Sequence, residues 1–273
     1  MSARISIVTP VFNGARYIAA CVQNVVAQNV EGLEHIVVDG SSTDGTIAIL
    51  EKLKTQYDHL KYVSERDSGQ SDAMNKGVRM ASAELIGVLN ADDFYEPGAI
   101  REAVEFLESN PPIDFVTGDC NMRDENDVVT HINRPRDLRP ESILLGWEYA
   151  EYPVNPSAYF YRKRIHDVVG NYIVSEHYAM DVCFIYSCAT KVKTAYQPRL
   201  WGNFRHLPGT KTVSNQTNAP RIMRDLRRQY IRKLPLGRRL PLSIKAFFWN
   251  ARLSYWQMAK ALKGNNVRVR PQQ

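Results

Sequence analysis

Few features of secreted or membrane-spanning proteins occur in this sequence of 273 residues. Its four cysteines form no CxxC pair and show no disulfide-framework spacing, so we expect free, packed thiols in a reducing cytoplasm. No run approaches the ~20 apolar residues that span a bilayer. The first residues enter a strand pattern at once and lack the apolar core of a signal peptide. We therefore expect a cytoplasmic protein.

Other absences narrow the range of functions. No pair of the six histidines has the spacing of metal ligands on one helix, which argues against a zinc site. No internal repeat or low-complexity segment occurs. The segment TPVFNG at 9–14 lacks the glycine-rich loop and basic residue that nucleotidyltransferases making activated sugars usually carry after their first strand. The sequence therefore argues against a nucleotidyltransferase of that class.

Positive charge is concentrated in the C-terminal part of the sequence. The net charge is +6, but residues 220–273 contain fourteen Lys or Arg and one acid, Asp225, which gives this segment +13. Residues 1–219 must then carry −7, the difference between +6 and +13. We expect residues 216–273 to form a basic, amphipathic helical extension that is separate from the body.

Strand and helix patterns alternate through the first 120 residues. Apolar runs predict strands at 4–9, 34–39, 60–63, 85–89 and 115–117, and helical spacing predicts helices at 15–28, 46–54, 71–81 and 97–108. From about residue 122 the pattern is less regular, with strands expected at 128–132 and 155–161, helices at 162–169 and 180–190, and extended structure at 193–205. This order predicts a mostly parallel, doubly wound α/β sheet with helices on both faces.

Polar signatures follow four of the predicted strands, at residues 9–13, 39–42, 65–69 and 90–93. Ligands of such sheets bind beyond the carboxyl ends of the strands, so we expect these four segments to meet at one crevice. The adjacent carboxylates of Asp92 and Asp93 are well placed there to hold a divalent cation against phosphates. Helix capping is the alternative role of either residue, and for Asp93 capping or support of its neighbour is expected.

Four motifs in order resemble the family 2 glycosyltransferases with the GT-A fold. They are SIVTPVFN at 6–13, VDGSSTDGT at 38–46, DSGQSDAMNKG at 67–77 and LNADD at 89–93. The resemblance covers residues 4–212 and implies a GT-A domain at 1–215, with a nucleotide-binding half at about 1–120 and an acceptor half at 121–215. It also implies inverting transfer of a sugar from a nucleotide diphosphate, such as UDP, to a hydroxyl of a glycan or lipid-linked acceptor.

The same resemblance assigns residues to the donor site. Implied nucleotide-sugar contacts are Thr9, Pro10, Val11, Asp39, Asp67, Asp72, Asn90, Ala91 and Asp92. Asn90-Ala91-Asp92 matches the family's Asp-x-Asp motif, with Asp92 as the ligand of Mn²⁺ or Mg²⁺. Asn90 departs from the commoner acid and contributes less negative charge, although its amide can still hydrogen-bond a ribose hydroxyl.

Asp181 matches the family's catalytic base, and Glu176 and His177 are rival candidates. A base that takes the acceptor's proton typically contributes ~10²–10⁴-fold in rate. Arg205, His206 and Lys211 could neutralise the diphosphate from a flexible loop, or they could form a solvated basic loop.

The basic tail also carries an apolar and aromatic stretch at 244–258. This combination fits an amphipathic helix on an anionic membrane, which would make the protein peripheral on the inner face. Packing of the aromatics against the body is the alternative. No nucleic-acid partner is expected, because no RNA-recognition signature accompanies the charge. A non-catalytic, membrane-associated relative that acts as a scaffold is a further alternative, kept open by Asn90.

Overall fold

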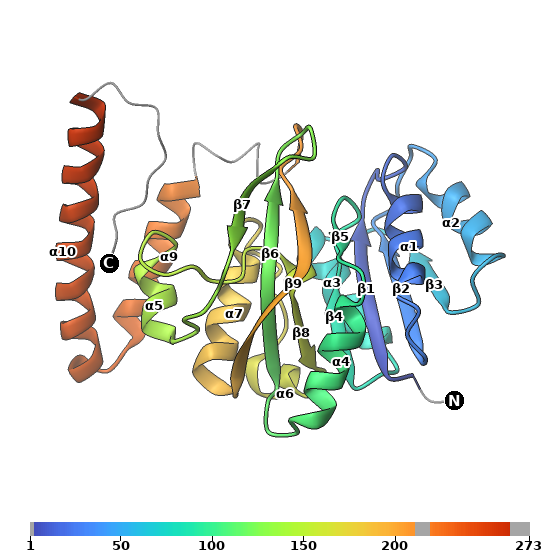
Figure 1. Cartoon of the computed structure of the whole chain (residues 1–273), viewed down its shortest axis with the longest axis horizontal. Helices are drawn as coiled ribbons and strands as arrows, with labels where there is room; N and C mark the ends of the chain where they lie inside the picture. Colours follow the sequence, from blue (N-terminus) through green and yellow to red (C-terminus); the bar gives the residue numbers. More distant parts are fainter. Residues whose placement is uncertain (1–2, 211–218, 263–273) are drawn as a thin grey trace.

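The computed structural model describes the backbone of residues 3–210 and 219–262, and the side chains of residues 3–210 and 221–252. Figure 1 shows one twisted sheet with helices on both faces, and two C-terminal helices at the end of the molecule farthest from α2. The predicted α/β class and the helical C-terminal extension are confirmed. Among the described residues, no helix combines the length and apolar composition that crossing a bilayer requires.

The nucleotide-binding half is a regular alternation of strands and helices. Its parallel strands lie in the order β3-β2-β1-β4. They are β1 (Ile5–Val11), β2 (Leu33–Asp39), β3 (Leu60–Ser64) and β4 (Leu85–Val88). The helices are α1 (Ile18–Ala27), α2 (Thr46–Lys54), α3 (Gln70–Met80) and α4 (Ala99–Ser109).

The remaining strands extend the sheet as β4-β8-β6-β9-β5, with β7 paired to β6. They are β5 (Phe94–Tyr95), β6 (Phe115–Arg123), β7 (Val129–Asn133), β8 (Tyr159–Arg162) and β9 (Thr194–Arg205). The helices after β7 are α5 (Pro140–Leu145), the 3₁₀ turn η1 (Pro156–Ala158), α6 (Ile165–Val169), α7 (Met180–Lys191), α9 (Ala219–Lys233) and α10 (Leu236–Leu262). Antiparallel β8 joins the two parts of the sheet.

Successive side chains of the central strands point to opposite faces of the sheet and pack into two separate hydrophobic layers. Ile5 and Ile7 of β1 pack with α1 and α4 on one face. Val8 packs with α3 and α7 on the other. A Cβ on Gly77 would lie 2.2 Å from Cγ1 of Val8, so α3 reaches the sheet this closely only because residue 77 is glycine. This contact lets α3, which follows the loop 65–69, pack directly on β1.

Candidate active site

A cavity of about 790 Å³ opens at the carboxyl ends of β1, β2 and β4. This volume falls in the range of small-molecule sites. Its lining includes Pro10, Val11, Asp67, Asn90, Ala91 and Asp92 from the first half of the chain and Asp181 from the second. The predicted convergence of the strand ends is therefore observed, and it includes a carboxylate about ninety residues farther along the chain.

The end of β2 and the loop 65–69 fit tightly together. A Cβ on Gly40 would lie 2.7 Å from Oδ2 of Asp67, so only glycine allows the carboxylate this position. The Oδ1 atom of Asp67 accepts a hydrogen bond from the backbone N–H of Gly69 at 2.8 Å. Asp67 is thus held at the cavity wall by backbone geometry.

Two of the predicted nucleotide-binding residues lie below the cavity surface. Asp39 is fully buried, and its carboxylate accepts hydrogen bonds from the backbone N–H of Ser42 at 3.0 Å and the hydroxyl of Ser64 at 2.7 Å. Thr9 is also buried, with its hydroxyl 2.9 Å from Nε2 of His35. In this structure both side chains lie beneath the cavity and support the backbone that forms its surface. Gly40 and Pro10 beside them line the cavity.

Asp72 is not among the residues that line the cavity. Its Oδ2 atom accepts a hydrogen bond from the backbone N–H of Ser68 at 3.1 Å and lies 3.5 Å from Nζ of Lys76. Lys76 also lies 2.9 Å from Glu65. Asp72 therefore fastens the loop that carries Asp67 to α3.

The turn after β4 is organised by Asp93, which is buried beneath it. Its carboxylate accepts hydrogen bonds from the side-chain amides of Asn90 at 2.9 Å and Asn155 at 2.7 Å, and from the backbone N–H of Arg205 at 3.0 Å. Burial and the neighbouring Asp92 raise the pKa of Asp93 above its usual range. Asp93 thus supports its neighbours, and the N-cap of the following helix α4 is Gly98.

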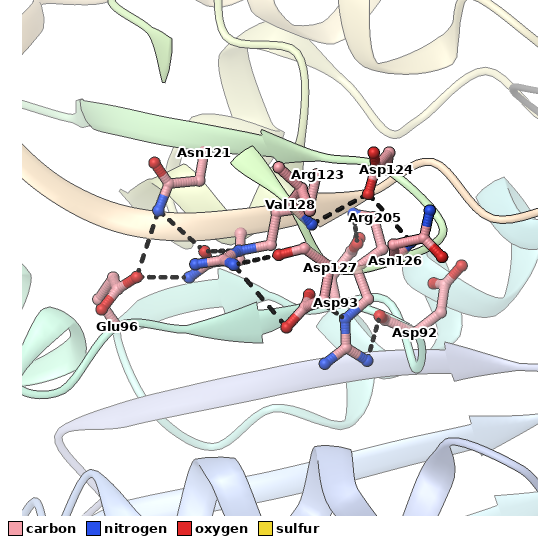
Figure 2. A network of polar contacts seen from close by, with 11 residues as sticks. Asp92, Asp93, Glu96, Asn121, Arg123, Asp124, Asn126, Asp127, Val128 and Arg205 are labelled. Carbon is pink, nitrogen blue, oxygen red and sulfur yellow. Dashed lines mark hydrogen bonds and ion pairs between the residues drawn. The ribbon is translucent and has the colours of Figure 1, made fainter. Parts of the chain in front are cut away.

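Arg205 ends β9 and is held on several sides. Its Nε atom lies 3.4 Å from Oδ1 of Asp127, and its Nη1 atom donates to the backbone carbonyl of Asp92 at 3.4 Å. Its guanidinium lies 4.7 Å from the centroid of the Phe94 ring. Figure 2 shows Arg205 between the turn of the β6–β7 hairpin and Asp92. The contact with Asp127 therefore holds the guanidinium beside the turn 90–92, but Arg205 is not among the residues that line the cavity.

The side chains at the cavity could coordinate a divalent cation only together with a bound small molecule. Among the described residues, no three His, Cys, Asp or Glu side chains gather closely enough to hold a metal. Asp92 lines the cavity, and burial raises its pKa while the charge of Arg205 opposes that rise. A single carboxylate at the cavity wall suits Mn²⁺ or Mg²⁺ bound jointly by protein, phosphates and water.

Asp181 lies in the first turn of α7 and lines the cavity. The hydroxyl of Tyr159 donates a hydrogen bond to Oδ1 of Asp181 at 3.1 Å. Burial and the Asp181 carboxylate raise the pKa of Tyr159 well above its usual value, so the phenol remains a donor at neutral pH. The neighbouring strand β8 thereby orients the proposed base.

The other candidates for base and diphosphate contacts occupy different places. His177 lines the cavity, whereas Glu176 does not. His206 stacks edge-on against Phe204, with ring centroids 4.4 Å apart, and does not line the cavity. Lys211 lies outside the described residues.

Several cavity residues were not predicted as site residues from the sequence. They include Phe12, Tyr17, Gln70, Tyr178 and Phe204. Phe12 is 65% exposed, whereas every residue of the preceding strand β1 is buried. Phe12 and Gln70 lie inside two of the recognised motifs, so position within the motif was the available signal.

Comparison with known proteins agrees with this geometry. The sequence model of glycosyl transferase family 2 matches residues 6–170, which is more than half of the chain. Chondroitin synthase of Escherichia coli is 34% identical over 128 residues, which cover 46% of this chain and 19% of that protein. The chain thus spans about a fifth of the length of that relative.

Solved structures share the fold at low sequence identity. A mannosyltransferase from Pyrobaculum calidifontis, in complex with GDP-Man and Mn²⁺, superposes with a TM-score of 0.66 at 17% identity, covering 97% of this chain and 82% of that one. S. aureus TarS in complex with UDP-GlcNAc gives 0.59 at 16% identity, covering 77% of this chain and 61% of that one. The chain belongs to glycosyl transferase family 2, and it has the GT-A fold of nucleotide-sugar-dependent glycosyltransferases.

Proposed function

We propose that this protein is an inverting, metal-dependent hexosyltransferase. It would move a sugar from a nucleotide diphosphate to a hydroxyl of a glycan or lipid-linked acceptor. The observation that carries the proposal is the composition of one cavity. Asp67 and the turn 90–92 come from the nucleotide-binding half, and Asp181 comes from the acceptor half.

Binding of the donor nucleoside is assigned to the wall formed by β1, β2 and the loop 65–69. Val11 and Asp67 line this wall, and Asp39 fixes the turn that contains Gly40. Asn90 accepts a hydrogen bond from Gln70 at 2.8 Å, so its amide is oriented before any donor arrives. Preorganised polar groups of this kind reduce the cost of ordering a ligand.

The diphosphate would lie over the turn 90–92. When bound, Mn²⁺ or Mg²⁺ supplies positive charge that stabilises the leaving diphosphate. Asp92 would hold the cation together with phosphate oxygens. Arg205 does not line the cavity, but its guanidinium donates to the carbonyl of Asp92 at 3.4 Å and would add positive charge behind the turn that holds the diphosphate. Such preorganised charge is usually a large contribution to catalysis.

Asp181 would act as the general base. Its carboxylate takes the proton of the acceptor hydroxyl while that oxygen bonds to the anomeric carbon, and the bond from that carbon to the diphosphate oxygen breaks. Attack from the face opposite the leaving group inverts the configuration. The hydrogen bond from Tyr159 holds the carboxylate in place during this step.

The biological setting proposed is assembly of cell-surface polysaccharide or glycolipid at the inner face of a membrane. Similarity to a chondroitin synthase supports a glycan acceptor. Structural neighbours bind UDP-GlcNAc and GDP-Man, so both nucleotides belong in any test, with UDP as our first expectation.

The test is a screen of the full chain against UDP- and GDP-sugars, with and without Mn²⁺, in the presence of glycan and lipid-linked acceptors. We expect release of the nucleoside diphosphate that depends on acceptor and Mn²⁺. Release of pyrophosphate from a nucleoside triphosphate and a sugar phosphate would instead identify a nucleotidyltransferase and refute the proposal. The anomeric configuration of the product, read by NMR, tests inversion.

A further inference from the structure

The helix α10 presents a continuous apolar face to solvent. Five large side chains along it are 49–71% exposed, and they are Leu236, Leu240, Ile244, Phe247 and Phe248. Leu236 and Leu240 lie one turn apart before Pro241, and Ile244, Phe247 and Phe248 share one side of the helix after it. We call these five residues the outer face of α10. Contiguous exposed apolar surface of this kind marks an interaction site.

The opposite side of α10 is fixed against the body of the protein. Leu242 is 4% exposed and Trp249 is 9% exposed. The Trp249 ring lies edge-on to Tyr149, with centroids 5.2 Å apart, and Lys245 lies 4.6 Å from the Tyr149 ring centroid. The outer face therefore cannot turn inward without breaking this packing.

Helices α9 and α10 are anchored to α5 and α7 of the body. Arg227 donates to the carbonyl of Leu145 in α5 at 2.9 Å, and Tyr230 packs on Tyr186 of α7, with ring centroids 4.5 Å apart. Arg238, at the start of α10, forms an ion pair with Glu141 of α5. Figure 1 shows α10 as the outermost element at this end of the molecule. The outer face is thus held rigidly outward by contacts at several points.

The charged residues of α10 itself are all basic. Helix α10 contains no Asp or Glu from Leu236 to Leu262. By helical spacing, Arg239 flanks the outer face on one side. Lys245 and Arg252 flank it on the other, at the border with the packed side, where they lie over the rings of Tyr149 and Trp249. An apolar stripe of leucine, isoleucine and phenylalanine with basic residues on both sides is the pattern of a helix that lies in the plane of a membrane interface.

We infer that the outer face of α10 docks the protein onto an anionic lipid bilayer. Phe247 and Phe248 enter the acyl boundary, while the flanking cations stay with the lipid headgroups. Charge favours this occupant over a second copy of the chain. Isologous pairing of two outer faces would bring the basic residues that flank one face close to those that flank the other.

The experiment measures binding of the full chain to vesicles of phosphatidylcholine with 30% phosphatidylglycerol, by flotation at about 150 mM salt. We expect binding to these vesicles and little to pure phosphatidylcholine. Phe247→Ser with Phe248→Ser should weaken binding by about tenfold or more, because each ring loses its burial in the bilayer. Lys245→Gln with Arg252→Gln should weaken it by roughly fivefold per charge and flatten its salt dependence.

Val168→Ser with Ile173→Ser is the matched control, since these residues are also exposed, by 53% and 44%, and Val168 belongs to α6, which Figure 1 shows well away from α10. This pair should bind vesicles like the unmodified chain. Equal binding by the Phe247/Phe248 variant would overturn the inference. A second result would also overturn it: no vesicle binding by the unmodified chain, with light scattering that shows a dimer for this chain and a monomer for the Phe247/Phe248 variant. The outer face would then bind a second copy of the chain. Vesicle binding requires no sugar transfer, so its failure leaves the proposed activity intact.

Discussion

The hydroxyl of Tyr159 offers a sharp test of how the proposed base is held. Replacing Tyr159 with Phe removes one O–H group, which donates to Oδ1 of Asp181 at 3.1 Å. The aromatic ring stays, and it is fully buried with its centroid 5.2 Å from that of Phe115. The substitution therefore alters the support of Asp181 while keeping the packing of β8.

The magnitude follows from how the hydrogen bond positions the carboxylate. A hydrogen bond to a charged group contributes about 1.5–3 kcal/mol, and here that energy holds the carboxylate in one orientation. Because a misplacement of about 1 Å can cost about 100-fold in rate, we expect kcat to fall by roughly 10- to 100-fold. The carboxylate also loses a donor that favours its charged form, so the acid limb of the kcat profile should move to higher pH.

Steady-state kinetics of Tyr159→Phe across pH provide the measurement, with thermal unfolding as a check of the fold. Tyr161→Phe is the matched control. That residue is equally buried, but its hydroxyl contacts Nε2 of His166 at 3.3 Å and the hydroxyl of Tyr172 at 3.5 Å instead of Asp181. An unchanged kcat and pH profile in Tyr159→Phe, or equal losses in both variants, would refute the assigned role.

Three further predictions concern the donor site and stability. Gly40→Ala should raise the KM for the donor roughly tenfold with little change in kcat, since its Cβ would lie 2.7 Å from Asp67 and overpacking costs about 1–3 kcal/mol; an unchanged KM would contradict this. Asp92→Ala should lower the Mn²⁺-dependent rate about a hundredfold or more, read from Mn²⁺ titrations, and a normal Mn²⁺ response would remove Asp92 as the metal ligand. Burial acts to raise the pKa of Glu34, but hydrogen bonds led by that from Lys61 lower it from 4.5 to about 2. Its contribution to stability is therefore complete above pH 4.5 and lost as pH falls towards 2, so Glu34→Gln should flatten the acid side of the stability curve measured by denaturant unfolding.

Much of the fold could be predicted because its signals are local. The helix predicted at 46–54 is observed at Thr46–Lys54, and the strand predicted at 34–39 is part of Leu33–Asp39. The segment 155–161 was predicted as one strand, but it begins with the 3₁₀ turn Pro156–Ala158. Asn155 caps that turn and also binds Asp93, a contact across sixty residues that no local pattern contains.

The site was predictable to the extent that strand ends predict a crevice. That rule brought Asp67, Asn90 and Asp92 to one cavity, and motif resemblance added Asp181. The strand-end rule did not predict that the Asp39 side chain would be buried beneath the cavity. The hydrogen bonds of Asp39 with Ser42 and Ser64 form only in the folded chain. The ion pair of Arg205 with Asp127 in the β6–β7 turn could not be predicted from the sequence either, because β6, β7 and β9 meet only in the folded chain.

The most direct measurement is the response of Asp181→Asn in parallel assays of donor binding and sugar transfer. An amide keeps the size of the carboxylate but cannot take the acceptor's proton. We expect donor affinity, measured by calorimetry with Mn²⁺, to stay within about threefold of the unmodified chain while kcat falls by ~10²–10⁴-fold. Transfer at a near-normal rate by Asp181→Asn would show that the base lies elsewhere, with His177 as the next residue to test.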